Sequence, residues 1–74
     1  MTKLDLYGLA VLTRDLPEHD LRAGDVGTVV ELLDSTGVII EFRDVAGDTR
    51  AVVALKVTDV RRGQPREMLS VRSA

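Results

Sequence analysis

The sequence predicts a small all-β domain, and three observations support this prediction. The chain has 74 residues, which is enough for one hydrophobic core but not for two. Its apolar residues fall in short runs rich in β-branched side chains, as is typical of strands. Short segments containing Gly and Asp separate most of these runs, and they are the right length for hairpin turns.

The order of these runs predicts five strands. They are expected over residues 9–13, 25–33, 38–42, 49–55 and 60–61. A long loop follows the first strand, and residues 56–59 are too few for an α-helix and predict one 3₁₀ turn before the last strand. In the two hairpins, Asp34 is expected to bond the following backbone, and Gly37 and Gly47 are expected to take positive φ.

Alternation of side chains predicts which strand faces line the core. Val38, Ile40 and Phe42 share one face of their strand, and Ala51, Val53 and Leu55 share one face of the next. Five short strands with this turn pattern predict an SH3-like barrel, because closure hides the sheet edges of so short a chain. An open three-stranded meander is the alternative.

The domain organisation is expected to be simple. Residues 1–8 form an N-terminal lead-in, residues 9–62 form the barrel domain, and residues 63–74 form a flexible basic tail. Residues 1–60 carry six Lys or Arg against eleven Asp or Glu, whereas residues 61–74 carry four Arg against one Glu. The predicted body is therefore acidic and the predicted tail basic.

Composition argues against several classes of protein. Apolar residues make up 45% of the chain and charged residues 30%, a balance typical of folded domains. The chain has no Cys, which rules out disulfides and thiolate chemistry and agrees with a reducing cytoplasm, the expected location. No run approaches the length of a membrane span, and the first residues do not match a secretion signal.

No pattern in the chain predicts catalysis, a cofactor or a metal site. His19 lies among Asp15, Glu18 and Asp20, but this spacing matches no established ligand set, so a solvated acidic loop is expected. The segment around Gly24 and Gly27 lacks the Lys and the following helix of a phosphate-binding loop. The hydroxyl groups have no base beside them. The chain is therefore expected not to be an enzyme.

Two resemblances add to this interpretation. Residues 10–18, residues 21–31 and the later features Ile40-Glu41-Phe42, Gly47-Asp48-Thr49 and Ala54-Leu55 to Val60 resemble the domain of unknown function 4926 family over residues 9–61. That resemblance implies a small bacterial SH3-like barrel without an assigned activity, and an antitoxin or immunity role beside a larger protein. Gly24 and Gly27 ahead of Val29 also resemble the KOW motif of barrels that contact RNA. Those barrels are typically basic, and readers of single strands need aromatic platforms, whereas Tyr7 and Phe42 are the only aromatic residues here.

Three functions are compatible with these features of the sequence. The first is a protein-binding module that uses an acidic surface against a basic partner. Its candidate residues are Asp15, Glu18, Asp20 and Asp25. The second is a nucleic-acid accessory that contacts phosphates through its tail. Its candidate residues are Arg61, Arg62, Arg66 and Arg72. The third is a structural homo-oligomer in which strand edges or residues such as Ile39 and Val52 pair between copies.

Overall fold

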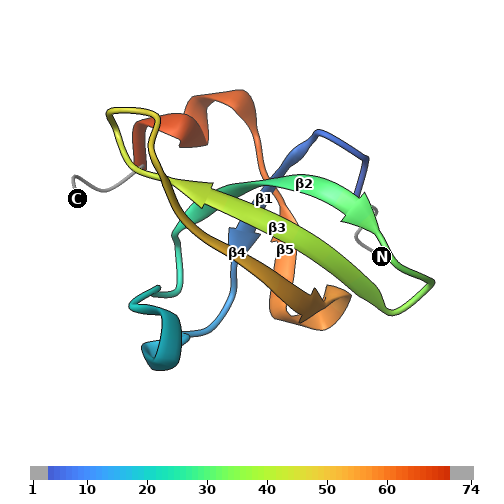
Figure 1. The fold of residues 1–74 in the computed structure, drawn as a ribbon. Coiled ribbons are helices and arrows are strands. Elements are labelled where there is room, and N and C mark those ends of the chain that lie inside the picture. Colours follow the sequence, from blue (N-terminus) through green and yellow to red (C-terminus); the bar gives the residue numbers. More distant parts are fainter. Residues whose placement is uncertain (1–3, 71–74) are drawn as a thin grey trace.

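A single antiparallel sheet of five strands forms the body of the computed structural model, which describes residues 4–70 (Figure 1). Across the sheet the strands run in the order β4-β3-β2-β1-β5. Their bounds are β1 Leu9–Leu12, β2 Val26–Leu32, β3 Gly37–Arg43, β4 Thr49–Lys56 and β5 Val60–Arg62.

Three 3₁₀ helices complete the described part of the chain, which contains no α-helix. They are η1 Pro17–His19, η2 Val57–Asp59 and η3 Pro65–Ser70. The predicted all-β class and the 3₁₀ turn before the last strand are confirmed.

Two hairpins and one return strand define the topology. Strands β2, β3 and β4 follow one another as antiparallel neighbours, and β5 then lies beside β1. Strands β4 and β5 are the two edges, and no ladder joins them among the described strands, so the sheet is open. The ladder between β2 and β3 shifts register between Val29 and Glu31, which bends β2 so that its first half can pair with β1. Closure into a barrel stays a prediction.

The core lies on one face of this bent sheet. Among the residues that the structure describes, the largest fully buried side chains are Phe42, Leu12, Leu16, Ile40, Val29 and Val38. The predicted inner faces of β3 and β4 are confirmed, with Ala51 packed against the core but only partly buried. Gly27 is also buried, and a Cβ there would lie 2.5 Å from Ile40 Cγ2, so this glycine permits the close approach of β2 and β3.

The two hairpin turns are closed in different ways. Asp34 Oδ1 accepts the N–H groups of Thr36 and Gly37 and the Thr36 hydroxyl, as predicted for a turn aspartate. These bonds hold the pKa of Asp34 below its ordinary value. The positive φ predicted at Gly37 is wrong, because the Asp34 carboxylate closes this turn and Gly37 is already the first residue of β3. The prediction for Gly47 is confirmed, at φ 88°.

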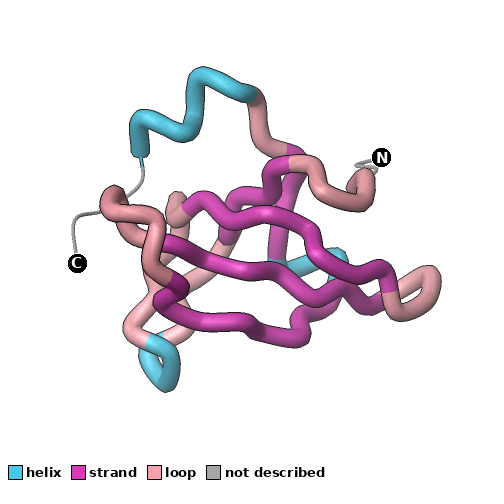
Figure 2. The backbone as a smooth tube through the Cα atoms, turned by 45° about the horizontal axis from the view of Figure 1, so that its top comes forward, coloured by secondary structure: helices cyan, strands magenta, loops and turns pink. Residues whose placement is uncertain are grey.

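Two segments are more regular than the sequence predicts. The long loop contains η1, and within the segment expected to form a flexible tail, Pro65–Ser70 forms η3. Helices η1 and η3 lie on opposite sides of the sheet (Figures 1 and 2). None of the helical segments within residues 4–70 combines the length and apolar character needed to cross a membrane. The tail residues 71–74 and the first three residues lie outside the described part of the chain.

Candidate binding surfaces

The loop between β1 and β2 is held firmly to the body. Leu16 and Leu21 are both buried in the core, and their backbones pair with each other, with N–H to O distances of 2.9 and 3.1 Å. Pro17 begins η1 between them and has the φ that a helical first turn requires. These two leucines therefore anchor the loop to the core.

Three of the four predicted acidic residues come together on this loop. Asp15 is exposed, and its Oδ1 accepts the Ala23 N–H at 2.8 Å. Glu18 is exposed on η1. Asp20 ends η1 in the left-handed region, at φ 55°, and its carboxylate is 82% exposed and 3.2 Å from Arg50 Nη2. We call Asp15, Glu18 and Asp20 the acidic loop.

Asp25 does not belong to the acidic loop. Its side chain is buried at the start of β2, and its Oδ2 accepts the Arg22 N–H at 2.9 Å. The prediction that Asp25 forms part of an exposed acidic surface is therefore wrong. A carboxylate that satisfies a backbone donor inside the fold has a structural role.

The four predicted arginines differ in what they contact. Arg61 donates to both carboxylate oxygens of Glu67, at 3.1 and 2.6 Å, and the Gln64 N–H donates to Glu67 at 2.8 Å. The Arg61 guanidinium and this N–H lower the pKa of Glu67 to about 2. Arg61 thus fixes η3 to β5 and is not simply a phosphate ligand. Arg62 and Arg66 are exposed, and Arg72 lies outside the described residues.

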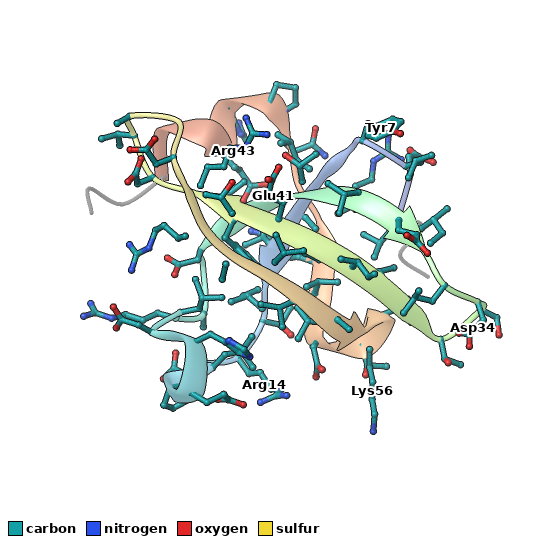
Figure 3. The ribbon with its side chains drawn as sticks, viewed as in Figure 1. Tyr7, Arg14, Asp34, Glu41, Arg43 and Lys56 are labelled. Carbon is teal, nitrogen blue, oxygen red and sulfur yellow. The ribbon has the colours of Figure 1, made fainter. Side chains whose placement is uncertain are left out.

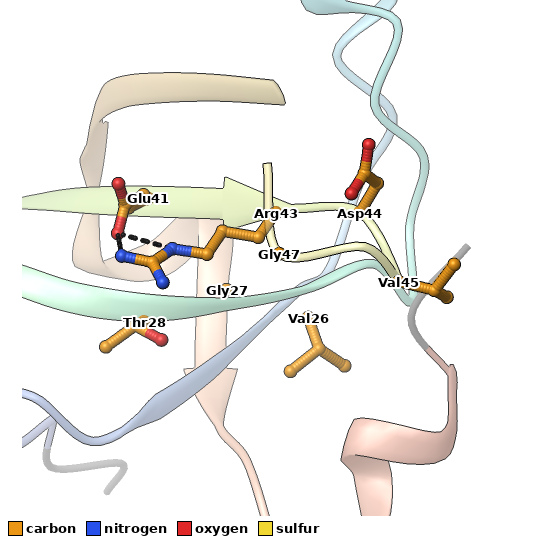
Figure 4. Close-up of a pocket in the computed structure, with 8 residues that line it drawn as sticks. All are labelled: Val26, Gly27, Thr28, Glu41, Arg43, Asp44, Val45 and Gly47. Atoms are coloured by element: carbon orange, nitrogen blue, oxygen red, sulfur yellow. Dashed lines mark hydrogen bonds and ion pairs between the residues drawn. The ribbon is translucent and has the colours of Figure 1, made fainter. Parts of the chain in front are cut away.

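A pocket of about 400 Å³ opens on the outer face of the sheet, beside the hairpin between β3 and β4 (Figure 4). Its lining residues are Val26, Gly27, Thr28, Glu41, Arg43, Asp44, Val45 and Gly47. Glu41 Oε1 lies 2.8 Å from Arg43 Nη2, and Glu41 Oε2 accepts the Thr49 hydroxyl at 3.0 Å. The Thr49 bond, followed by the Arg43 bond, lowers the pKa of Glu41.

The charges in this pocket are already paired, which limits its chemistry. A carboxylate held ionised by two donors is a weak base, so Glu41 is poorly suited to remove a proton from a substrate. Asp44 is also engaged, because its Oδ1 accepts the N–H groups of Ala46 and Asp48. This pocket was not predicted from the sequence, although the alternation in β3 places Glu41 and Arg43 on the outer face of the sheet.

A second pocket, of about 250 Å³, lies where the N-terminal lead-in meets β5 and η3. Its lining residues are Asp5, Tyr7, Gly8, Leu9, Arg62, Gly63 and Pro65. Tyr7 stands on the turn before β1 with its side chain directed outward (Figure 3). Among the described residues, no group of three or more His, Cys, Asp or Glu side chains could hold a metal ion, and His19 is simply exposed on η1.

Comparison with known proteins gives one finding. A family model described as a domain of unknown function, DUF4926, matches residues 6–62, which is more than half of the chain. The chain matches no curated protein and no solved structure. The match covers every strand and the acidic loop, and it ends at Arg62 before η3 begins.

Proposed function

This chain belongs to the DUF4926 family of domains of unknown function, and from that premise we propose that it is a non-enzymatic protein-binding module. Its acidic loop binds a basic surface on a larger protein. The single observation that carries the proposal is the exposure of three carboxylates on a loop whose backbone is fixed by buried leucines. A loop fixed before binding loses little conformational entropy when it docks.

The electrostatics of the loop support a basic partner. Residues 14–25 contain four carboxylates and two arginines. Arg14 Nε lies 2.9 Å from Asp59 Oδ1. Arg14 is therefore already paired with a carboxylate of η2, the turn before β5. Asp59, whose pKa this ion pair lowers, offsets the charge of Arg14. Arg50 offsets Asp20 in the same way, and Asp25 is buried, so the exposed carboxylates of Asp15 and Glu18 against the single charge of Arg22 leave the loop net negative. This charge speeds association with a positively charged surface.

The same proposal includes an architecture and a setting. The bend of β2, the return of β5 to β1 and the turn η2 before β5 support an SH3-like barrel. We place the module in the bacterial cytoplasm as the antitoxin or immunity partner of a larger protein. Proteins that bind nucleic acid carry basic surfaces, so a toxin that cuts nucleic acid has the charge that the acidic loop would match.

The test compares two variants that lose the same charge at different places. Glu18→Gln with Asp20→Asn removes two carboxylates from the acidic loop, and Asn tolerates the left-handed backbone at position 20. Glu31→Gln with Asp48→Asn removes two exposed carboxylates elsewhere and is the matched control. Each variant and the natural chain are used to capture partners from the native cell, and the captured protein is then purified for affinity measurements across a salt series.

The expected result is a slower association rate and a weaker salt dependence for the acidic-loop variant alone. The control variant should behave like the natural chain. Equal binding by all three chains would show that the acidic loop is the wrong surface. Turnover of any substrate by the purified chain would contradict the non-enzymatic part of the proposal.

A further inference from the structure

Tyr7 combines an unusual backbone with an exposed side chain. Its φ is 66°, in the left-handed region that large side chains rarely adopt, and the residue is 73% exposed. Positive φ at a residue other than Gly costs free energy and tends to persist where it serves a function. An exposed ring recovers little of this cost through burial.

Hydrogen bonds on both sides hold this conformation. The Gly8 N–H donates to the Asp5 carbonyl at 2.9 Å, which closes a four-residue turn with Tyr7 in its third position. The Tyr7 N–H donates to the Val29 carbonyl at 2.6 Å, and the Val29 N–H donates to the Gly8 carbonyl at 2.9 Å. A turn with positive φ at its third position ordinarily has Gly or Asn there. The fold thus specifies the turn, but nothing in the described contacts requires the tyrosine ring.

The residues around Tyr7 form a pocket whose cation, Arg62, is held only by a long ion pair. Gly63 follows β5 and packs so tightly on β1 that a Cβ there would lie 2.9 Å from Leu9 Cβ, and this brings Arg62 and Pro65 to the Tyr7 turn. The side chain of Arg62 is 61% exposed and lies 3.7 Å from Asp5 Oδ2. Such a long, exposed ion pair contributes little and is easily exchanged for another anion.

We propose that this pocket binds single-stranded nucleic acid, with a base stacked on the Tyr7 ring and a phosphate at Arg62. Arg66, exposed on η3 directly after Pro65, lies one residue beyond the pocket and serves the next phosphate. Single strands bind where cationic side chains lie beside an exposed aromatic ring, because each base has a flat face and each linkage carries a negative charge. The phosphate displaces Asp5 from Arg62.

The acidic loop does not prevent this binding. It lies on the side of the sheet opposite η3 (Figures 1 and 2). The Debye length is about 10 Å at 0.1 M salt, so repulsion between exposed charges that lie farther apart than this is largely screened. The inference goes beyond the proposed protein-binding function, and the two surfaces can be tested separately.

The experiment titrates the full chain into a short fluorescein-labelled oligothymidine at low salt and follows fluorescence anisotropy. Tyr7 is the only Tyr and the chain has no Trp, so the NMR signals of its ring report stacking directly. The expected dissociation constant is on the order of 10⁻⁴ to 10⁻⁶ M, and the Tyr7 ring signals shift with the same titration curve. A duplex of the same length, whose bases are already stacked, binds more weakly.

Four variants separate a binding role from a structural one. Tyr7→Phe keeps the ring and binds like the natural chain, whereas Tyr7→Gly weakens binding about fivefold or more. Tyr7→Gly also raises the melting temperature, because Gly adopts positive φ without strain. Arg62→Gln lowers the slope of log affinity against log salt by about 0.7. Arg22→Gln, an exposed arginine on the side of the acidic loop, is the matched control and leaves that slope unchanged.

Three results would overturn the proposal. One is the absence of an anisotropy change at every attainable protein concentration. Another is equal affinity of the natural chain and Tyr7→Gly, which would show that the ring takes no part. The third is equal affinity for the single strand and the duplex, since stacking on Tyr7 requires an unpaired base.

Discussion

Adding one methyl group at Gly27 tests the packing of the whole sheet. Gly27 lies in β2 opposite Ala10 of β1 and Phe42 of β3. A Cβ at this position would lie 2.5 Å from Ile40 Cγ2 and 2.9 Å from both Glu41 O and Phe42 Cδ1. The carbonyl oxygen belongs to the backbone of β3, so it cannot move without disturbing the ladder between β2 and β3. Gly27→Ala must therefore push two paired strands apart.

The size of the effect follows from two opposing terms. Overpacking of a core costs about 1–3 kcal/mol, and replacing Gly by Ala in the unfolded chain returns about 0.4–1 kcal/mol. The net loss of unfolding free energy is then roughly 0.5–2 kcal/mol. In a domain of this size each 1 kcal/mol lowers the melting temperature by about 4–8 °C.

Gly37→Ala is the matched control for this measurement. Its nearest neighbours would lie 3.4–3.6 Å from the new Cβ, which is ordinary contact, and its φ is not in the left-handed region. This variant should therefore be as stable as the natural chain or more stable by up to about 1 kcal/mol. Thermal and urea unfolding followed by circular dichroism give both values. Equal stability of the two variants would refute the close approach of β2 and β3.

Two further predictions concern the core and η3. Ile40→Val removes one methyl group from a fully buried side chain and should cost about 0.5–1.5 kcal/mol in a urea titration, with no change in the circular dichroism spectrum. Glu67 should titrate near pH 2, below its ordinary value near 4.5, because Arg61 and the Gln64 N–H favour the ionised form. Since the pKa is lowered in the folded chain, the stabilisation of η3 is present above about pH 4.5 and is lost as the pH falls toward 2, which the Gln64 amide signal in an NMR titration should follow.

The strands were predictable because their signal is local. Alternation in residues 38–42 depends only on neighbouring side chains, and the structure buries Val38, Ile40 and Phe42 as that alternation requires. The hairpin at Asp34 was predictable for the same reason, since its carboxylate bonds to residues two and three positions along. Gly37 was mispredicted because Gly and Asp can each close a turn, and composition does not say which one does so.

The binding surfaces were harder to predict because they depend on contacts between distant residues. Tyr7 takes its backbone conformation partly from the Val29 carbonyl, which is far along the chain. In the sequence, Asp25 is one more charged residue of a polar loop, and only the fold places its carboxylate against the Arg22 N–H inside the body. Helix η3 is held by the ion pair between Glu67 and Arg61, and the periodicity of the sequence carries no signal for such a pair.

Because the acidic loop and the Tyr7 pocket are separate surfaces, the charge of the loop should affect oligothymidine binding at the pocket only at low salt. At 0.01 M salt the Debye length is about 30 Å, close to the 32 Å long axis of the molecule, whereas at 0.1 M it is about 10 Å. Glu18→Gln with Asp20→Asn should therefore strengthen oligothymidine binding at 0.01 M salt, because a distant repulsion is removed. At 0.1 M the same variant should bind like the natural chain. An effect that persists at 0.1 M would mean that the strand contacts the acidic loop itself, and the two surfaces would then be one.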